Sequence, residues 1–150
     1  MNTFRGWPTQ TLLMPDGGVV ACLVYKTGKE PRFSLFEENH NVFRLDRACK
    51  VMWQVRRNEG GARAQWAQMR EKAEADDSGD FEMHSPFLSM HLRFRDGSTN
   101  KDPMTEAGPP DACWVEGATV ICRTLDSMTY ELDVDTGIAV NVTPFGIRPW

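Results

Sequence analysis

The feature of this sequence that most restricts its fold is a series of short apolar runs separated by turn residues. Residues 19–25 (VVACLVY) follow Asp16-Gly17-Gly18 and have the composition of a central strand. Several later runs alternate apolar and polar residues, which is typical of a strand with one buried face. We therefore expect strands over residues 19–25, 33–36, 42–46, 51–56, 87–94, 114–115, 119–123, 128–133 and 138–142.

Two groups of these runs match each other without a gap. Residues 43–55 (FRLDRACKVMWQV) align with residues 130–142 (YELDVDTGIAVNV), and the match extends backward to cover 33–55 and 120–142. With the nearest upstream strand, each copy forms a four-stranded antiparallel meander. Either the chain contains an internal repeat, or two half-buried meanders are alike because their alternation is common.

The second copy also resembles a known structural unit. A strand, a Thr-Gly turn and a second strand resemble the last two strands of a quinoprotein-type β-propeller blade, through Tyr130, Leu132, Asp133, Thr136 and Gly137. Propellers close with about four to eight blades, so the resemblance implies local structure and no activity. We interpret Asp135-Thr136-Gly137 as a turn in which glycine supplies a positive φ. A calcium loop would need a further oxygen ligand and a later glutamate.

One segment has helical periodicity. Ala62, Trp66, Met69 and Ala73 lie at i, i+4, i+7 and i+11, which places them on one face of a helix. We expect a helix over 62–75 that packs through Trp66 and Met69. The sequence thus predicts a single β-rich α+β domain spanning residues 1–150. About eight antiparallel strands would form two four-stranded meander units, as a sandwich or curved sheet, with this one helix.

The composition fits a globular domain and indicates where the protein acts. Of the 150 residues, 41% are hydrophobic and 25% are charged, which is unlike a disordered chain. No apolar run approaches the roughly 20 residues of a membrane helix, and the first residues do not form a secretory signal. We expect a cytoplasmic protein without membrane contact, with four free thiols and with Cys22 and Cys122 in the core.

Charge is distributed unevenly between the two halves. Residues 1–70 carry a balance of +5 and residues 71–150 a balance of −9, for a net charge of −4. A general nucleic-acid-binding protein normally presents a basic field, so we expect no nucleic-acid partner. The acidic second half is compatible with a basic protein partner.

The usual catalytic and cofactor motifs are missing from the sequence. The histidines, His40, His84 and His91, lack the spacing of metal ligands. The chain has no P-loop and no dinucleotide-binding glycine motif, so we expect neither a metal nor a cofactor. A hydrolase or transferase that uses Cys49 with His40, or a carboxylate cluster, is one alternative.

The most distinctive charged segment is residues 74–82 (EADDSGDFE), with five acids in nine positions. It is either a solvated loop after the helix or a recognition surface for a basic partner, with an aromatic anchor. The candidate partner-binding residues are Glu74, Asp76, Asp77, Asp80, Phe81 and Glu82.

These features favour a non-enzymatic acidic protein-binding module, acting as a monomer or homodimer. The leading hypothesis is a bacterial immunity or inhibitor protein that neutralises a basic toxin by mimicking nucleic-acid phosphates. A small-molecule-binding β-domain is the second hypothesis, with Trp7, Trp53 and Trp114 lining a cleft between the sheets.

Overall fold

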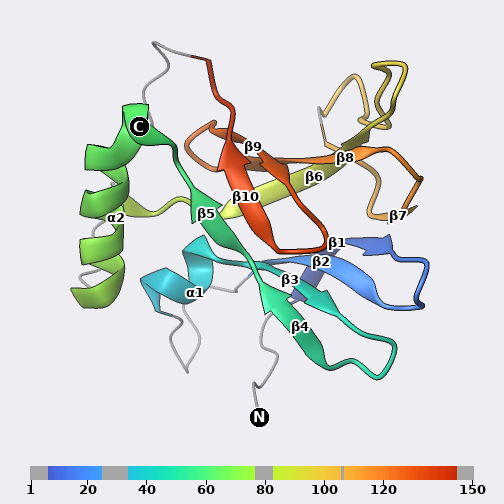
Figure 1. Cartoon of the computed structure of the whole chain (residues 1–150), viewed down its shortest axis with the longest axis horizontal. Coiled ribbons are helices and arrows are strands. Elements are labelled where there is room, and N and C mark those ends of the chain that lie inside the picture. Colours follow the sequence, from blue (N-terminus) through green and yellow to red (C-terminus); the bar gives the residue numbers. More distant parts are fainter. Residues whose placement is uncertain (1–6, 25–33, 77–82, 106, 145–150) are drawn as a thin grey trace.

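The chain folds into two β-sheets with helices at one end (Figure 1). The computed structural model describes residues 7–24, 34–76, 83–105 and 107–144. Within these ranges each sheet has five strands, in the orders β4-β3-β2-β1-β7 and β5-β10-β9-β8-β6. The predicted fold class, a β-rich α+β fold built from antiparallel meanders, is confirmed.

Each sheet contains one four-stranded meander. The first sheet is built from β1 (Trp7–Leu13), β2 (Val19–Val24), β3 (Val42–Leu45), β4 (Val51–Gln54) and β7 (Asp111–Cys113). The second is built from β5 (Arg56–Asn58), β6 (Phe87–Arg93), β8 (Thr119–Thr124), β9 (Thr129–Leu132) and β10 (Ile138–Asn141). Strands β1 to β4 pair antiparallel in chain order, and so do β6, β8, β9 and β10.

The fifth strand of each sheet comes from the other half of the chain. Strand β7 lies parallel to β1, and β5 lies parallel to β10. Neither strand was predicted as it stands: β5 reads Arg-Arg-Asn and β7 reads Asp-Ala-Cys, too short for an alternating pattern. The predicted strand at 114–115 is wrong, because β7 ends at Cys113. Because each half of the chain contributes one strand to the sheet of the other half, neither sheet is complete without both halves.

A single extended segment passes from one sheet to the other at Val55. The Val55 N–H donates to the Val42 carbonyl in the first sheet, at 2.9 Å, and the Arg56 N–H donates to the Gly137 carbonyl in the second, also at 2.9 Å. The strand predicted over 51–56 is therefore divided into β4 and β5. Because consecutive residues bond to different sheets, this crossing fixes the sheets to each other along one edge.

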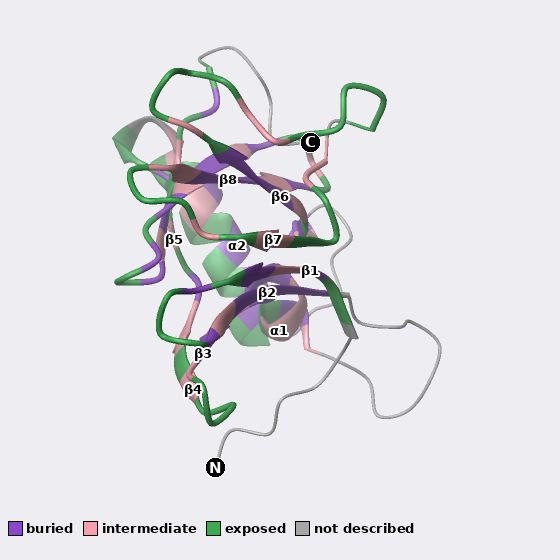
Figure 2. Cartoon of the chain, turned by 90° about the vertical axis from the view of Figure 1, so that its right-hand side faces the viewer, coloured by how far each residue is buried: buried purple, intermediate pink, exposed green. Residues whose placement is uncertain are grey.

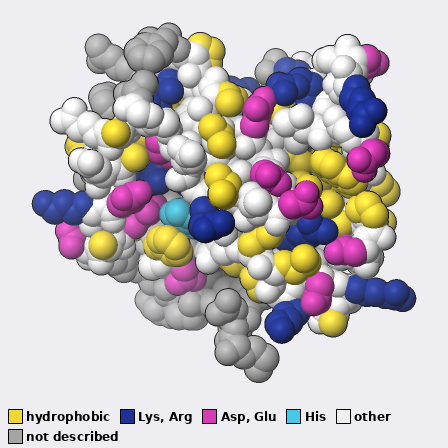
Figure 3. Space-filling model, in the orientation of Figure 1, with side chains coloured by type: hydrophobic (Ala, Val, Ile, Leu, Met, Phe, Trp, Pro, Cys, Tyr) yellow, Lys and Arg dark blue, Asp and Glu magenta, His cyan; other side chains and the backbone are white. Residues whose placement is uncertain are grey.

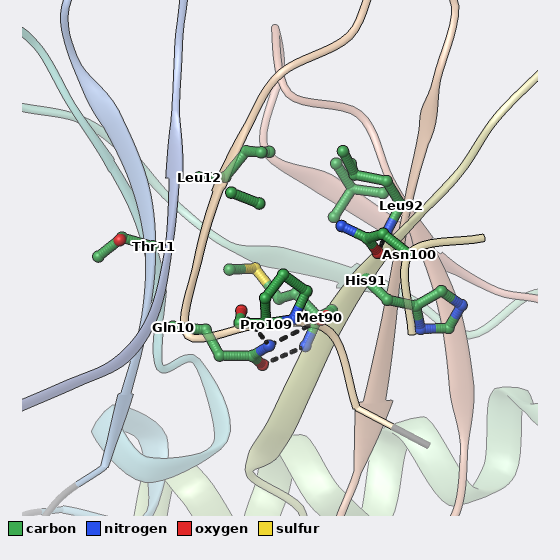
Figure 4. Close-up of a pocket in the computed structure, with 10 residues that line it drawn as sticks. Gln10, Thr11, Leu12, Met90, His91, Leu92, Asn100 and Pro109 are labelled. Atoms are coloured by element: carbon green, nitrogen blue, oxygen red, sulfur yellow. Dashed lines mark hydrogen bonds between the residues drawn. The ribbon is translucent and has the colours of Figure 1, made fainter. Parts of the chain in front are cut away.

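Two buried carboxamides join the sheets along the opposite edge. Gln10 donates from Nε2 to the Met90 carbonyl at 2.9 Å and accepts from the Met90 N–H at 2.6 Å (Figure 4). Asn41 binds the carbonyl and N–H of Phe87 in the same way, at 2.8 and 2.9 Å. A primary amide has both a donor and an acceptor, so each side chain takes the place of a neighbouring strand beside β6.

The two aligned copies correspond in position only over their last two strands. The bounds of β3 and β9, and of β4 and β10, are separated by the same 87 positions. Upstream of these strands the aligned residues Leu35 and Cys122 differ in structure, because Leu35 begins a helix whereas Cys122 lies on β8. The first strand of the first meander is β1, which the sequence did not predict because Pro8 interrupts its pattern; a register shift follows Pro8.

Helix α1 (Leu35–Asn39) replaces the strand predicted over 33–36 and the turn that follows it. Ser34 is its N-cap and accepts a hydrogen bond from the Glu37 N–H at 3.1 Å. Ser34 and Glu37 have the spacing of a capping box, and this signal outweighs the alternation of Phe33 and Leu35. Residue 33 itself lies outside the described residues.

Helix α2 (Ala64–Asp76) follows a short 3-10 turn, η1 (Gly61–Arg63), and confirms the predicted helix. Its buried face differs from the prediction: Trp66 and Ala73 are buried, but Met69 is 52% exposed. Arg70 and Glu74 are buried instead, because they contact polar partners on other elements: Glu59 for Arg70, and Asn39 and His40 for Glu74. The predicted packing through Met69 is therefore wrong.

The hydrophobic core lies between the two sheets (Figure 2). It contains Cys22 and Cys122, as predicted, on the equivalent strands β2 and β8. All four cysteines are free, and those in the core are buried while Cys49 and Cys113 are exposed. Burial raises the pKa of the Cys22 thiol to about 12.

Candidate functional site

A network of buried charges connects α2 with the second sheet. We name it the Glu59 cluster, and it consists of Arg57, Glu59, Arg70, Glu74 and Tyr130. The side chains of Arg57, Glu59 and Arg70 are 0%, 2% and 1% exposed. Charged side chains are rarely buried to this degree unless they are paired, so the contacts within the cluster determine whether the fold tolerates it.

Glu59 is the centre of this cluster. Its carboxylate forms an ion pair with the Arg70 guanidinium and accepts a hydrogen bond from the Tyr130 hydroxyl. Arg57 Nε lies 3.5 Å from Glu59 Oε2, and Asn141 donates to Glu59 Oε1 at 3.1 Å. Burial acts to raise the pKa of Glu59, but the two guanidinium groups and the hydroxyl outweigh it and the pKa is lowered. Glu59 is therefore an anion at neutral pH.

Arg57 is buried among carbonyl groups and aromatic rings. Its guanidinium donates to the Ser85 carbonyl at 2.7 Å, the Ser85 hydroxyl at 2.9 Å and the Tyr130 hydroxyl at 2.6 Å. Its Cζ lies 5.0 Å from the ring centroid of Phe87 and 4.9 Å from that of Tyr130, within the range of a cation–π interaction. Burial raises the pKa of Tyr130, so the hydroxyl remains a neutral phenol and links the two charges.

Glu74 connects the cluster to α1. Its carboxylate accepts from Asn39 Nδ2 at 2.8 Å, lies 3.3 Å from His40 Nε2 and lies 3.5 Å from Arg70 Nε. Burial acts to raise the pKa of Glu74, but His40, Asn39 and Arg70 outweigh it and the pKa is lowered. The other ring nitrogen of His40 lies 3.0 Å from the Val55 carbonyl. Both ring nitrogens of His40 therefore contact oxygen atoms of the protein.

A surface hollow lies above this cluster, between α1, the β4–β5 crossing and α2. Its volume is about 410 Å³, and its walls include Phe36, His40, Arg56, Arg70 and Glu71. We name it the α1–α2 hollow. Figure 3 shows apolar, acidic and basic side chains around a histidine in the region of α1 and β5. The hollow is thus a mixed polar and aromatic surface of the size that small molecules occupy.

The opposite end of both sheets is formed by turns. Five turns, at 14–18, 46–50, 94–98, 115–118 and 133–137, meet there, and we name this end the turn face. Arg44 and Trp53 from the first sheet both donate to the Val134 carbonyl in the second, at 2.8 and 2.9 Å. Gly137 has φ +78°, as the predicted turn requires, and a Cβ there would lie 2.6 Å from the Trp53 ring. The turns are therefore held in a fixed arrangement.

The turn face is acidic on the side of the second sheet. The turns at 94–98, 115–118 and 133–137 contain the acids Asp96, Glu116, Asp133 and Asp135 and one base, Arg95. Asp96 and Asp133 also bind backbone N–H groups of their own turns, at 2.9 Å each, which fixes their carboxylates. This side of the molecule carries part of the negative charge that the sequence assigns to the second half.

Apolar side chains lie beside these acids. Leu13 and Val115 are 49% and 46% exposed, and the half-buried Trp114 is held beside Leu13 because its main-chain N–H donates to the Leu13 carbonyl at 2.8 Å. Figure 3 shows hydrophobic side chains grouped on this side of the molecule, with acidic side chains at the edge of the group. An apolar centre with a charged rim is the usual composition of a protein-binding surface.

Of the six predicted partner-binding residues, the structure describes Glu74 and Asp76. Glu74 is buried at 7% exposure, within the Glu59 cluster, whereas Asp76 is exposed at the end of α2. The other four, Asp77, Asp80, Phe81 and Glu82, lie outside the described residues. The structure thus assigns Glu74 an internal role and leaves Asp76 available on the surface.

The predicted pair of Cys49 and His40 is wrong. His40 precedes β3 and is bound to Glu74, whereas Cys49 lies in the turn after β3 with φ +64°. The four residues of β3 extend about 13 Å between them. Among the described residues, no group of three His, Cys, Asp or Glu side chains could hold a metal ion.

Of the three tryptophans of the proposed cleft, the side chains of Trp53 and Trp114 are described. Trp53 lies against the turn at 133–137, and both it and Trp114 pack against the core at the turn face. The side chain of Trp7 lies outside the described residues. In the described ranges, neither helix has the length and apolar character that a membrane crossing requires.

Comparisons with known proteins give no match: no family model, no curated protein and no solved structure is similar to this chain. The function is therefore inferred from its own geometry.

Proposed function

We propose that this protein is a non-enzymatic acidic protein-binding module, and that it acts in the bacterial cytoplasm as an immunity or inhibitor protein against a basic toxin. The observation that carries the proposal is the turn face, where four acids in three turns lie beside exposed apolar side chains. A basic partner would gain both charge complementarity and buried apolar area from this surface.

The rigidity of the turn face favours tight binding. Asp16 forms an ion pair with Arg44 at 3.1 Å, and Arg44 binds the Val134 carbonyl, so turns from both sheets are linked. Trp53 supports the same carbonyl. A surface that is ordered before binding loses less conformational entropy when the partner docks. Acids on fixed turns can therefore present a constant pattern of negative charge to a nucleic-acid-binding site.

The end of α2 is a second candidate contact. Asp76 is exposed there, and the sequence continues with Asp77, Asp80, Phe81 and Glu82. The C-terminal end of a helix carries a partial negative charge, and the last turn of α2 contains no basic residue. This end therefore adds to the negative field that would attract a basic partner.

Affinity capture from lysate of the source cells tests the proposal when it is made with matched baits. The first variant, Glu116→Lys/Asp133→Lys/Asp135→Lys, reverses the acidic turns, and the second, Asp76→Lys/Asp77→Lys/Asp80→Lys, reverses the end of α2. Arg47→Glu changes the charge of a turn on the first-sheet side of the turn face but removes none of its acids, and it is the control.

The proposal predicts one basic protein that the wild-type and control baits retain at physiological salt. The first variant should lose this protein, and the second shows whether the end of α2 contributes. If no basic protein is retained, or if the partner binds all four baits equally, the proposal is wrong.

A further inference from the structure

The α1–α2 hollow is separate from the turn face and has the features of a small-molecule site. Its volume of about 410 Å³ falls within the usual range of ligand pockets. Its floor is fixed, because Arg70 is paired with Glu59 and Glu74 is bound by Asn39 and His40. The paired charges of the floor cancel, so they do not decide which ligand fits.

Two charged side chains on opposite walls are not used by the fold. Arg56 on β5 and Glu71 on α2 both line the hollow and are both exposed. Among the described residues, neither side chain has an ion pair or hydrogen bond to another. Arg70, which also lines the hollow, has a buried Nε without a hydrogen-bond partner among the described residues. A complementary ligand therefore carries a negative group for Arg56 and a positive group for Glu71.

The third wall is aromatic. Phe36 is 45% exposed and stacks on His40, with ring centroids 4.1 Å apart and an angle of 19° between the rings. His40 is held by Val55 and Glu74, so this ring pair has a fixed orientation. One face of Phe36 is covered by His40, and the rest of the ring offers apolar surface to a ligand. Flat apolar groups pack favourably on such a ring.

We propose that the α1–α2 hollow binds a small zwitterion with a flat apolar group, the chemistry of a free aromatic α-amino acid. Its carboxylate pairs with Arg56, its ammonium group with Glu71, and its ring packs on Phe36. The Arg56 N–H donates to the Gly137 carbonyl of the 133–137 turn at 2.9 Å, but none of the residues that line the hollow belongs to the turn face, so this site is independent of the proposed protein partner. Loss of one activity would leave the other in place.

Isothermal titration of the full chain with L-phenylalanine tests this site. Three analogues each remove one recognition element: phenethylamine lacks the carboxylate, 3-phenylpropionate lacks the ammonium group and L-alanine lacks the ring. We expect L-phenylalanine to bind and each analogue to bind at least about tenfold more weakly, which corresponds to the loss of one charge-assisted or stacking contact.

Variants connect the binding to this hollow. Phe36→Ala, Arg56→Gln and Glu71→Gln alter exposed side chains, so the fold should tolerate them, and each should weaken binding by about tenfold. Met69→Ala and Lys72→Gln on α2 do not line the hollow and are the controls. Circular dichroism of each variant verifies folding. The proposal is overturned if L-phenylalanine does not bind, if the analogues bind equally, or if the three hollow variants bind as the controls do.

Discussion

Glu59→Gln should be among the most destabilising conservative substitutions in this protein. The substitution keeps the shape of the side chain but removes the charge that compensates Arg57 and Arg70, whose side chains are 0% and 1% exposed. Breaking a buried ion pair by removal of one partner costs about 3–5 kcal/mol. Since 1 kcal/mol shifts the melting temperature of a chain of this size by about 2–4 °C, we expect a decrease of roughly 6–20 °C.

The matched control for this substitution is Glu131→Gln. Glu131 forms an ion pair with Arg93 at 2.8 Å, but both side chains are partly exposed, at 38% and 44%. Such surface pairs contribute about 0–1 kcal/mol. Urea denaturation, followed by tryptophan fluorescence, gives the free energy of unfolding of both variants. If Glu59→Gln is no more destabilising than Glu131→Gln, the Glu59 cluster does not stabilise the fold as we argue.

Two further predictions concern stability. The lowered pKa of Glu74 means that its ion pairs stabilise the fold above about pH 4.5, and that this contribution is lost as the pH falls through the folded-state pKa. In urea denaturation, Glu74→Gln should thus be less stable than the wild type at pH 5.5, and the difference in unfolding free energy should shrink as the pH is lowered below 4.5. A difference that stays constant with pH would contradict the assignment. Gly137→Ala should lower the free energy of unfolding more than Gly97→Ala, since both glycines have positive φ but only a Cβ at Gly137 meets the Trp53 ring. The backbone strain common to both substitutions is about 1–2 kcal/mol. Equal losses of unfolding free energy would refute the contact with Trp53.

The strands that the sequence predicted best are those bounded by clear turns. β9 and β10 flank Gly137, and their alternation matches the structure to within one or two residues. β5 and β7 were not predicted because they are parallel edge strands of three residues, and their pairing partners lie in the other half of the chain. Local patterns do not contain that information.

The Glu59 cluster could not be predicted from local sequence patterns either. Periodicity located α2 but assigned Met69 to the buried face and Glu74 to an acidic surface. Glu74 is buried because Asn39 and His40, 35 and 34 residues earlier, lie opposite it. Arg70 and Glu74 are four residues apart, a spacing that is common on exposed helix faces, and the local sequence does not indicate that both have partners far away in the chain. The one signal that could have been used is the capping box of Ser34 and Glu37, which predicts α1 and hence one wall of the hollow.

The most direct test of the proposed function is a protection assay with the basic protein recovered by affinity capture. Expression of that protein alone in a bacterial host should arrest growth, and co-expression of the wild-type chain should restore colony formation. Glu116→Lys/Asp133→Lys/Asp135→Lys should fail to restore it, whereas the Arg47→Glu control should protect as the wild type does. A harmless partner, or full protection by the variant with reversed acidic turns, would contradict the proposal that the turn face neutralises a basic toxin.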